Sequence, residues 1–398
     1  MSAPHAHHWT LQNDLTFLNH GSFGACPKVV LDVQSALRSR IEAQPVQFYA
    51  RDLYDLIDEA RRPLASFLDA DSSDIVFIKN ATEGVNSILR SLRFEPGDEL
   101  LVTDHGYPAC RNIIEFIAKR WSARVVVAKC PFPGADFDRF EDAILSAVTS
   151  KTKLALIDHV TSPTGLVLPI ERLVPQLEER GVPTLVDGAH GPGMLDLSLR
   201  QLNPSWYVAN CHKWICAPKG AGVLFARRDR QTGLHPACIS HGYGLASDMP
   251  ERSPLQLEFD WTGTHDPTPW LCVPTALKFM ATLLPGGWPA LRQRNRDLVL
   301  QGRDLLANTL GIAAPSSDEM IGHLAALPLP DADLDDRPSP LYGTKLQDTL
   351  VKDFRIEVPI VPWPSHPRRL LRISAAAYNE LGDYERLATA IRELKLCW

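Results

Sequence analysis

Lys213 is the residue of this sequence whose surroundings most suggest chemistry. It lies between two apolar runs, at residues 206–209 and 223–225, in a link rich in Gly, Pro and Cys. Two strands joined by such a loop would hold an amine at the edge of a sheet, where a lysine that loses its proton can form a Schiff base. Most loop lysines are solvated, and a solvated lysine is the better explanation of this segment when it is taken alone, so the prediction depends on the residues around it.

Two upstream segments follow apolar runs and carry groups that suit a flat, phosphorylated ligand. In Asn80-Ala-Thr-Glu-Gly84, the N–H groups of Ala81 and Thr82 and the Thr82 hydroxyl can bind an anion at a helix start. A plain helix cap would have the same sequence. Asp104-His-Gly-Tyr107 offers His105 or Tyr107 as a ring that stacks on the ligand, and the alternative is a solvated histidine beside a half-buried tyrosine.

Two further segments place an aspartate directly after an apolar run. They are Asp158-His-Val-Thr-Ser-Pro-Thr-Gly165 and Asp187-Gly-Ala-His190. An aspartate at a strand end can hold a protonated pyridine nitrogen and so make the ring an electron sink. For Asp187 alone, a helix cap is an equally good interpretation.

The elements that position these residues alternate between short apolar runs and helical patterns. The predicted strands lie at 75–78, 100–102, 125–128, 154–157 and 184–186, with two more on either side of Lys213. Such alternation indicates a mostly parallel sheet covered by helices on both faces. Ligands of these sheets bind beyond the carboxyl ends of the strands, which is where every segment above begins.

The sequence changes character after about residue 275. A long helical stretch runs from Trp288 towards Leu310, followed by a section rich in Pro and Asp at 327–340. We predict an irregular N-terminal segment (1–27), a large ligand-binding domain (28–275) and a small α+β domain (276–398).

Composition limits the class of protein. The chain has 398 residues, of which 45% are hydrophobic, and a net charge of −6; this charge argues against nucleic acid or an anionic membrane as a partner. No run is apolar and long enough to span a bilayer, and the N-terminus has no apolar signal core, so we expect a cytoplasmic protein. The eight cysteines are scattered without C-x-x-C spacing, which favours reduced thiols and no metal site.

The combination and order of these segments carry a resemblance that no single segment does. Phosphate loop, stacking ring, aspartate and lysine follow one another as in the fold-type I enzymes that use pyridoxal 5′-phosphate, and in particular the class V aminotransferase family. The resemblance extends from Leu18-Asn-His-Gly-Ser-Phe-Gly24 to Leu371-Arg-Ile-Ser374. Asn-Cys-His-Lys-Trp, Ala-Pro-Lys-Gly and His-Val-Thr-Ser-Pro-Thr-Gly look most like the isopenicillin N epimerase group, which also takes in carbon–sulfur lyases. The fold implied is a seven-stranded, mostly parallel sheet flanked by helices, with a small C-terminal α+β domain.

The resemblance assigns roles to residues that touch the cofactor. Lys213 would bind pyridoxal phosphate and then take the Cα proton. Asp187 would pair with the pyridine nitrogen, and His190 would lie near the 3′-oxygen of the ring. By position His105 would stack on the ring, while Tyr107 would stack in its place or act as an acid or base on the far face. The phosphate would be held by Ala81, Thr82, Asn210 and His212.

The resemblance also implies a second subunit and a substrate pocket. Thr262 and Thr264 match a pair that closes the phosphate site of the neighbouring subunit, which implies a homodimer with shared active sites; an ordinary turn is the alternative. Arg372 matches the arginine that clamps the substrate α-carboxylate with a planar fork, and a surface salt bridge is its alternative. Weaker pocket candidates are Asn19, His20, Tyr49 and the neighbouring Arg51.

The sequence departs from the cysteine desulfurases of this family in two places. Ser162 stands where those enzymes carry an asparagine, so the contact with the ring oxygen must differ. No cysteine lies between Cys272 and Arg372, which argues against persulfide formation on a loop before the arginine.

These observations fix the first chemical step better than the second. We expect an enzyme that removes the Cα proton of an amino acid and is similar to isopenicillin N epimerase. The alternatives are a Cβ–S lyase acting on a cysteine conjugate or sulfoxide, a class V aminotransferase, and a catalytically inert binding protein.

Overall fold

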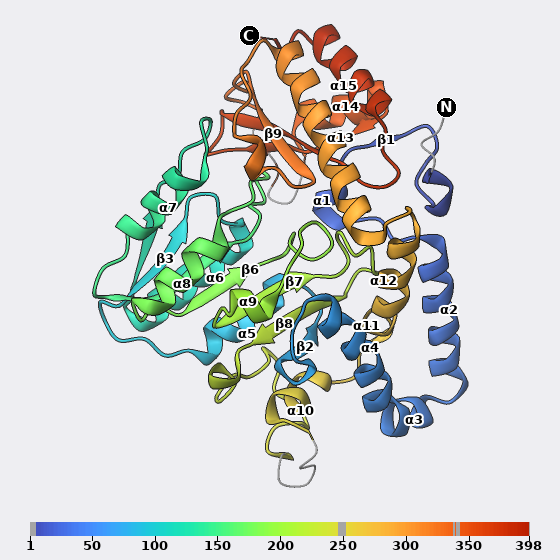
Figure 1. Ribbon diagram of the computed structural model, residues 1–398, viewed down its shortest axis with the longest axis vertical. Coiled ribbons are helices and arrows are strands. Elements are labelled where there is room, and N and C mark those ends of the chain that lie inside the picture. Colours follow the sequence, from blue (N-terminus) through green and yellow to red (C-terminus); the bar gives the residue numbers. More distant parts are fainter. Residues whose placement is uncertain (1–4, 246–251, 337–338, 340–342, 398) are drawn as a thin grey trace.

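The computed structural model describes residues 5–245, 252–336, 339 and 343–397. Its centre is a seven-stranded sheet in the order β2-β8-β7-β6-β5-β3-β4 (Figure 1). Every strand predicted from the sequence is present, with bounds as follows: β2 Ile75–Ile78, β3 Glu99–Thr103, β4 Arg124–Ala128, β5 Thr152–Asp158, β6 Thr184–Asp187, β7 Trp206–Asn210 and β8 Gly222–Ala226.

The sheet is mostly parallel, as predicted. Strands β4, β3, β5, β6 and β7 pair in parallel, whereas β8 runs antiparallel to both β7 and β2. Parallel strands end at the same edge, so the segments that follow β3, β5, β6 and β7 converge there. The reversal at β8 makes the chain turn back directly after β7, and this turn carries Lys213.

Helices cover both faces of the sheet because alternate strand residues point to opposite sides. Val208 and Leu224 pack on one face and Tyr207 and Val223 on the other. The first face is covered by α5 Ala81–Ser91, α6 Pro108–Trp121 and α10 Pro254–Asp260. The second is covered by α2 Lys28–Ala43, α4 Leu53–Phe67, α7 Phe137–Ser146, α8 Ile170–Glu179, α9 Leu199–Leu202, α11 Thr268–Leu271 and α12 Val273–Thr282.

A smaller unit follows, at the top of Figure 1. It contains a three-stranded antiparallel sheet in the order β11-β12-β9 together with the helices α13, α14 and α15. The elements are α13 Gly287–Leu310, β9 Leu324–Leu329, α14 Lys345–Phe354, β10 Ile356–Glu357, β11 Ile360–Pro362, β12 Arg369–Ser374 and α15 Leu381–Glu393. The boundary predicted after residue 275 falls inside α12, so we propose that the small domain begins after this helix.

The N-terminal segment is attached to the small domain. Strand β1 (Thr16–Phe17) pairs in parallel with β10, and the short helix α1 (His20–Phe23) follows it; the helical turn α3 (Pro45–Gln47) comes after α2. The N-terminal end of the described chain lies beside the small domain in Figure 1. Residues 19–22 are therefore brought to the junction of the two domains.

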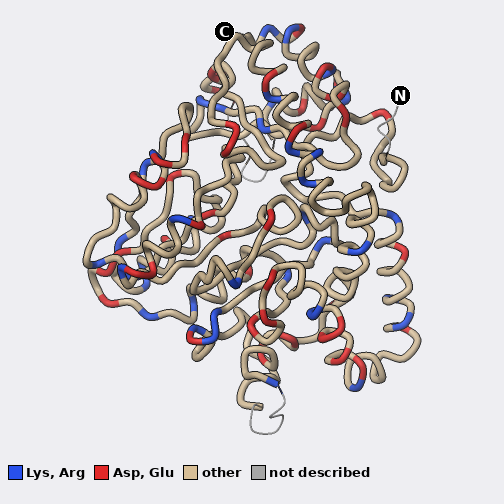
Figure 2. Tube along the Cα trace, viewed as in Figure 1, with Lys and Arg blue, Asp and Glu red and all other residues tan. Residues whose placement is uncertain are grey.

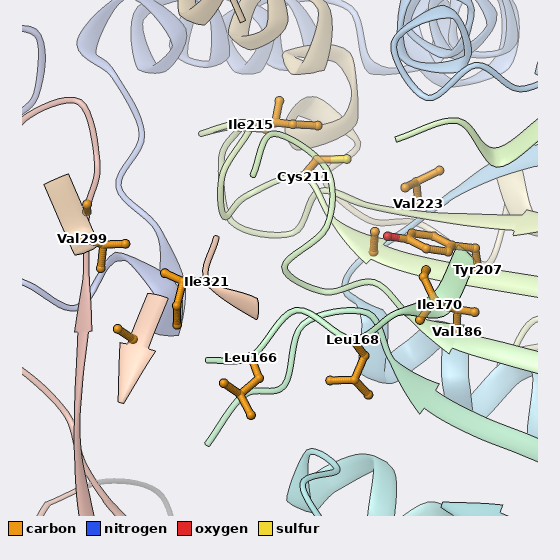
Figure 3. Packing of buried hydrophobic residues seen from close by; sticks show 14 of the residues in the cluster. Leu166, Leu168, Ile170, Val186, Tyr207, Cys211, Ile215, Val223, Val299 and Ile321 are labelled. Atoms are coloured by element: carbon orange, nitrogen blue, oxygen red, sulfur yellow. The ribbon is translucent and has the colours of Figure 1, made fainter. Parts of the chain in front are cut away.

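One apolar core runs through that junction. The cluster in Figure 3 joins Val186 and Tyr207 of the large sheet to Val299 of α13 and Ile321 before β9. Burial of a contiguous apolar surface of this kind resists separation of the two domains. The position of Arg372 relative to Lys213 is consequently set by core packing.

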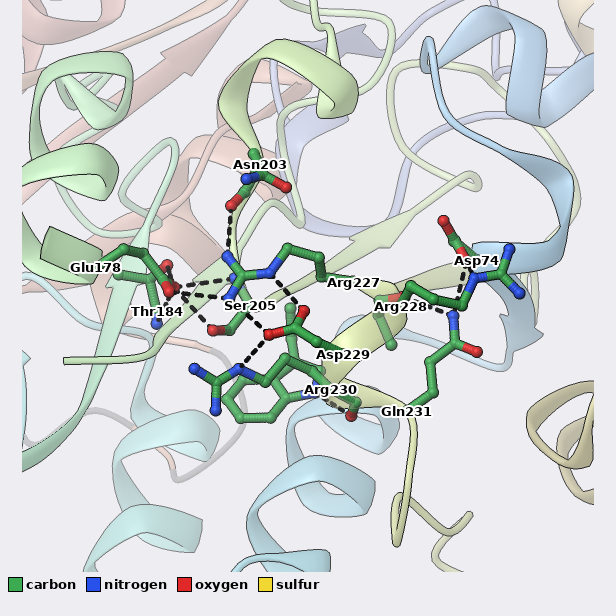
Figure 4. Close-up of polar contacts among 12 residues, drawn as sticks. Asp74, Glu178, Thr184, Asn203, Ser205, Arg227, Arg228, Asp229, Arg230 and Gln231 are labelled. Carbon is green, nitrogen blue, oxygen red and sulfur yellow. Dashed lines mark hydrogen bonds and ion pairs between the residues drawn. The ribbon is translucent and has the colours of Figure 1, made fainter. Parts of the chain in front are cut away.

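The strand ends opposite the site are closed by a polar network (Figure 4). The carboxylate of Glu178 accepts hydrogen bonds from Thr184 and Ser205, from both the backbone and the side chain, and from Arg227 at 3.2 Å. Thr184 begins β6, Ser205 directly precedes β7 and Arg227 directly follows β8, so the network fixes the three strands relative to one another. Elsewhere, Lys and Arg are interspersed with Asp and Glu over the trace (Figure 2).

No helix of the described residues is both long and apolar enough to cross a membrane. The cytoplasmic location stays a prediction.

Candidate active site

Lys213 is buried at the edge of the sheet where the parallel strands end. Its side chain is 9% exposed, and its Nζ lies 3.0 Å from Nε2 of His190. Burial lowers the pKa of Lys213 to about 7, and the positive charge of Arg372 adds to this effect, while the charge of Asp187 opposes it. Because the pKa lies near neutrality, a large share of Lys213 is the free amine, the form that a nucleophile or a base requires.

His190 connects this amine to the following residue in the chain, Trp214. The indole Nε1 of Trp214 donates a hydrogen bond to His190 Nδ1 at 3.3 Å. Burial, with the charges of Lys213 and Arg372, holds the pKa of His190 well below its usual value. The imidazole is therefore neutral.

Asp187 ends β6 and is 3% exposed. It accepts hydrogen bonds from the Ala189 N–H at 3.0 Å and from the Cys110 thiol at 3.1 Å. Burial raises its pKa, although both hydrogen bonds oppose the shift. Among the described residues no ion pair of Asp187 is seen, which leaves a buried carboxylate able to receive a cationic group.

Asp158 is the direct neighbour of Asp187, because the two residues are paired in register at the ends of β5 and β6. The backbone N–H of Tyr107 donates to its carboxylate, and burial followed by the charge of Asp187 raises its pKa well above the usual range. Asp158 is therefore the member of the pair that keeps a proton. It also holds the start of α6 in place.

The start of α5 forms the predicted anion site. Asn80 caps the helix by accepting from the Glu83 N–H at 2.9 Å, and Asn210 Oδ1 accepts from the Ala81 N–H at 2.8 Å. Among the described residues neither the N–H nor the hydroxyl of Thr82 has a hydrogen-bond partner. An anion placed there would meet two donors and the positive end of the helix dipole.

His212 contributes less to this site than predicted. Its Nδ1 donates to the Ala221 carbonyl at 3.0 Å, and burial lowers its pKa to about 4. In the neutral ring Nε2 is then an acceptor, which does not suit a phosphate. Its phosphate role stays a prediction.

The structure corrects the expectation that His105 stacks on a flat cofactor. The ring is fully buried, with Nδ1 2.7 Å from Thr164 Oγ1 and Nε2 3.3 Å from the Cys130 carbonyl. Phe140 and Trp363 enclose it, with ring centroids at 5.1 and 4.8 Å. No face of the imidazole remains for a ligand.

Tyr107, unlike His105, lies at the pocket that contains Asp187. It is 39% exposed and lines a pocket together with Asp158 and Asp187. A ring here can face a flat ligand held by Asp187. Of the two rings considered from the sequence, we therefore propose Tyr107 for stacking or for acid and base chemistry.

Arg372 on β12 joins three parts of the chain. Its NH1 donates to the Ser162 carbonyl at 2.5 Å and approaches the Ser162 hydroxyl at 3.2 Å, while NH2 donates to Ser22 Oγ at 3.0 Å. The side chain is 4% exposed, and its charge lowers the pKa of Lys213. A guanidinium whose charge reaches the Lys213 amine is suitably placed to hold a carboxylate. Ser162 accepts hydrogen bonds from this guanidinium and so helps to fix its orientation.

Asn19 and His20 are buried and hydrogen-bonded to residues around the site. His20 is fully buried; Nε2 lies 2.9 Å from the Lys213 carbonyl and Nδ1 lies 2.6 Å from the Tyr378 hydroxyl. Asn19 donates to Glu357 at 3.0 Å and accepts from Ser22 at 2.5 Å. They help to hold Lys213 and Ser22 in place, and their contact with substrate stays a prediction.

Tyr49 is hydrogen-bonded to the loop that carries Thr262 and Thr264. The Tyr49 hydroxyl donates to the His265 carbonyl at 2.8 Å, so it holds the loop that carries both threonines. Thr262 is partly buried in a pocket with Lys79 and Glu83 of the same chain, and Thr264 is exposed, as is Arg51. The contribution of these threonines to a second subunit stays a prediction.

Sequence reasoning missed residues that act through others. Trp214, Cys110, Ser22 and Tyr378 each bind a predicted site residue, but nothing in their local sequence distinguishes them from core or turn residues. Asp158 differs from these residues, because its position directly after an apolar run could have indicated from the sequence that it is a neighbour of Asp187.

Comparison with known proteins identifies the family. Residues 19–319 match the family described as Aminotransferase class-V. The chain belongs to this family. Isopenicillin N epimerase of Streptomyces clavuligerus is 33% identical over 387 residues, which are 95% of this chain and 94% of that protein. The probable L-cysteine desulfhydrase, chloroplastic, of Arabidopsis thaliana is 31% identical over 405 residues, covering 96% of this chain and 83% of that protein.

Solved structures show the same fold. A cysteine desulfurase from Escherichia coli superposes with a TM-score of 0.78 at 21% identity, covering 99% of this chain and 98% of that chain. The family depends on pyridoxal phosphate. The protein is therefore a pyridoxal phosphate-dependent enzyme, which sets aside the inert binding protein.

The residues present fit this cofactor. The Thr82 donors suit its phosphate, the buried Asp187 suits a protonated ring nitrogen, and the amine of Lys213 suits its aldehyde. Within the described residues, no group of three His, Cys, Asp or Glu side chains is arranged to hold a metal ion.

Proposed function

We propose that this enzyme removes the Cα proton of an α-amino acid and returns a proton to the opposite face, as an epimerase. The removal of the Cα proton rests chiefly on one observation: a buried lysine, whose pKa is lowered to about 7, lies close enough to a buried arginine for the charge of Arg372 to add to this shift. The first group can take a proton at neutral pH, and the second can fix the substrate carboxylate next to it. The similarity to isopenicillin N epimerase supports the same conclusion.

Each residue has a defined task in this scheme. The chemistry that pyridoxal phosphate supplies when bound is an electron sink for Cα. Arg372 holds the carboxylate and so orients the Cα–H bond towards Lys213. Lys213 takes the proton, and Tyr107 on the exposed side of the pocket delivers one to the other face. Asp187 keeps the ring nitrogen protonated.

A Cβ–S lyase is the second candidate, supported by the similarity to L-cysteine desulfhydrases. It would use the same base and the same arginine. The difference is that the electrons left at Cα expel a sulfur substituent from Cβ, and no acid on the opposite face is needed.

An isotope experiment separates the candidates. The enzyme is incubated with a panel of amino acids and cysteine conjugates in D2O, and the products are followed by proton NMR and chiral chromatography. Deuterium at Cα with inverted configuration supports the epimerase, and Tyr107→Phe should then slow inversion more than exchange. Pyruvate and ammonia identify the lyase, and a keto acid that forms without ammonia, and in quantity only when an α-keto acid is added as amino-group acceptor, identifies an aminotransferase. Lys213→Ala is the control, and exchange that survives in this variant would refute the assignment of the base.

We also propose that the enzyme is a homodimer with shared active sites, with Thr262 and Thr264 reaching the neighbouring phosphate site. Mixing inactive Lys213→Ala subunits with inactive Thr262→Ala subunits tests this. Shared sites predict partial recovery of activity in the mixed dimers, and no recovery would contradict sharing.

A further inference from the structure

Trp214 directly follows Lys213 in the chain, yet it reaches Lys213 through His190. Its indole N–H donates to His190 Nδ1 at 3.3 Å, and His190 Nε2 lies 3.0 Å from Lys213 Nζ. All three side chains are buried, at 3%, 1% and 9% exposure. Hydrogen bonds in such a place must be matched, because an unmatched buried donor costs free energy.

The chemistry of the three groups allows one assignment of the protons. An indole N–H can only donate, so Nδ1 of His190 must be the acceptor and carries no proton. A neutral imidazole has one N–H, which is then on Nε2. Nε2–H points at Lys213 Nζ and needs an acceptor, and an amine accepts only in its neutral form.

A protonated Lys213 would break this arrangement. An ammonium has three donors and no acceptor, so Nε2 would have to lose its proton and Nδ1 would have to gain one. The Nδ1–H would then face the indole N–H, with two donors opposed in a buried space.

The indole is held firmly enough to impose this preference. Trp214 packs in a small apolar cluster with Val160, Met194 and Leu324. Its ring contacts His20 at 4.7 Å and His323 at 5.1 Å between centroids. Because Leu324 and His323 belong to the small domain, docking of that domain helps to fix the indole.

We propose that Trp214 is a positioning residue that keeps Lys213 as a free amine by fixing the proton of His190 on Nε2. The inference rests on the proposed role of Lys213 as nucleophile and base, and it adds a residue that acts on Lys213 through His190.

Other titratable groups also act on this pair. Arg372 on β12 disfavours the ammonium, whereas the carboxylate of Asp187 on β6 favours it, as would Cys110 on α6 and Asp158 on β5 if they were ionised. On the His190 side, the charge of Arg372 disfavours a second proton on the ring, as would a charge on Lys213, His20 or His212. The test must therefore change the indole alone.

The first measurement is the titration of Lys213 in the full-length protein after removal of the cofactor with hydroxylamine. Competitive acetylation at a series of pH values, read by mass spectrometry of the peptide that contains Lys213, gives the pKa of its amine. Trp214→Phe should raise this pKa by about one unit, the effect of one net hydrogen bond, which leaves about tenfold less free amine under acidic conditions. Recovery of the cofactor absorption band on reloading shows that the stripped protein is native.

Trp206→Phe is the matched control. Trp206 is also buried, at 4% exposure, and its indole donates to a backbone carbonyl, that of Arg230, at 3.4 Å. It lies at the start of β7, away from Lys213. An equal pKa of Lys213 in the two variants would overturn the proposal.

The second measurement is nitrogen NMR of the protein labelled at histidine, with the His190 signals assigned by their loss in His190→Gln. The proposal requires a protonated Nε2 and an unprotonated Nδ1 in the wild-type protein. A proton on Nδ1 would overturn it, and this result is obtained even if Trp214→Phe fails to fold. Neither measurement needs a substrate, so failure of the proposed epimerase activity would leave both outcomes readable.

Discussion

Gly84 decides how closely α5 approaches the sheet, and Gly84→Ala tests whether this closeness sets the cofactor affinity. A Cβ at this position would lie 2.6 Å from Val208 Cγ1 and 2.7 Å from Ile78 Cδ1, where ordinary contacts are 3.4–4 Å. Relieving the contact with Val208 requires α5 to retreat by about 1 Å. The hydrogen bond between Asn210 and the Ala81 N–H, now 2.8 Å, would then exceed the usual limit of about 3.2 Å.

The expected magnitude differs between stability and binding. Overpacking costs about 1–3 kcal/mol, but alanine is favoured over glycine in a helix by about 1 kcal/mol, so the net loss of stability is small. Displacing the Thr82 donors from the phosphate should cost about 1.5–3 kcal/mol, which is roughly 10- to 150-fold in the dissociation constant of the cofactor. Cofactor affinity is therefore the decisive measurement.

The assay is titration of the cofactor-free protein with pyridoxal phosphate, followed by the absorption of the bound form. Gly382→Ala is the control, because a Cβ there meets no atom closer than 3.8 Å. The double variant Gly84→Ala/Val208→Ala removes the closest obstructing methyl and should recover part of the affinity. Wild-type affinity in Gly84→Ala, or no recovery in the double variant, would refute the argument that the helix is displaced.

Three further outcomes are expected. Arg372→Lys should lower kcat/KM for Cα exchange by about 100-fold, or ~2.7 kcal/mol, because a point charge replaces a bidentate fork; an unchanged value would exclude Arg372 as the carboxylate ligand. The rate of cofactor capture should fall about tenfold per pH unit below pH 7 and level off above it, since the pKa of Lys213 is lowered to about 7 and only the free amine reacts; stopped-flow absorption measures this, with Nα-acetyl-lysine as the control for the pH dependence of the cofactor itself. A thiol reagent should modify at most two cysteines of the native protein, Cys238 and Cys397, which are exposed, and rapid reaction of any other would contradict the burial described here. The six protected thiols are Cys26, Cys110, Cys130, Cys211, Cys216 and Cys272.

The large sheet was predictable because its signal is local. A strand buried on both faces is apolar along nearly its whole length, and runs such as Ile75–Ile78 and residues 206–209 show this directly. The segments after the strands were predictable for a related reason: parallel strands bring their carboxyl ends to one edge, so Asp187 and Lys213 meet there whatever the details of packing.

The local sequence did not contain the information that decides whether His105 or Tyr107 faces the ligand. Both residues follow β3 and both carry a ring. They are only two residues apart in the same turn, so the sequence alone does not show which ring faces the ligand. The direction of each side chain depends on Phe140 of α7 and on Trp363 of the small domain, which enclose His105. These partners are distant in the chain, and no property of residues 104–107 reveals them.

The sequence by itself determined the chemical inventory of this protein: a lysine, an aspartate, an anion-binding helix start and an arginine, in an order that places the first three at one sheet edge. Tertiary structure decided how each group behaves. Burial lowers the pKa of Lys213, the ring of His20 contacts the Lys213 carbonyl, and Arg372 reaches Ser22 and Ser162 across the domain junction. The reason is physical, because residue type and strand order are encoded locally, whereas the pKa of a group and its hydrogen-bond partners depend on everything packed around it.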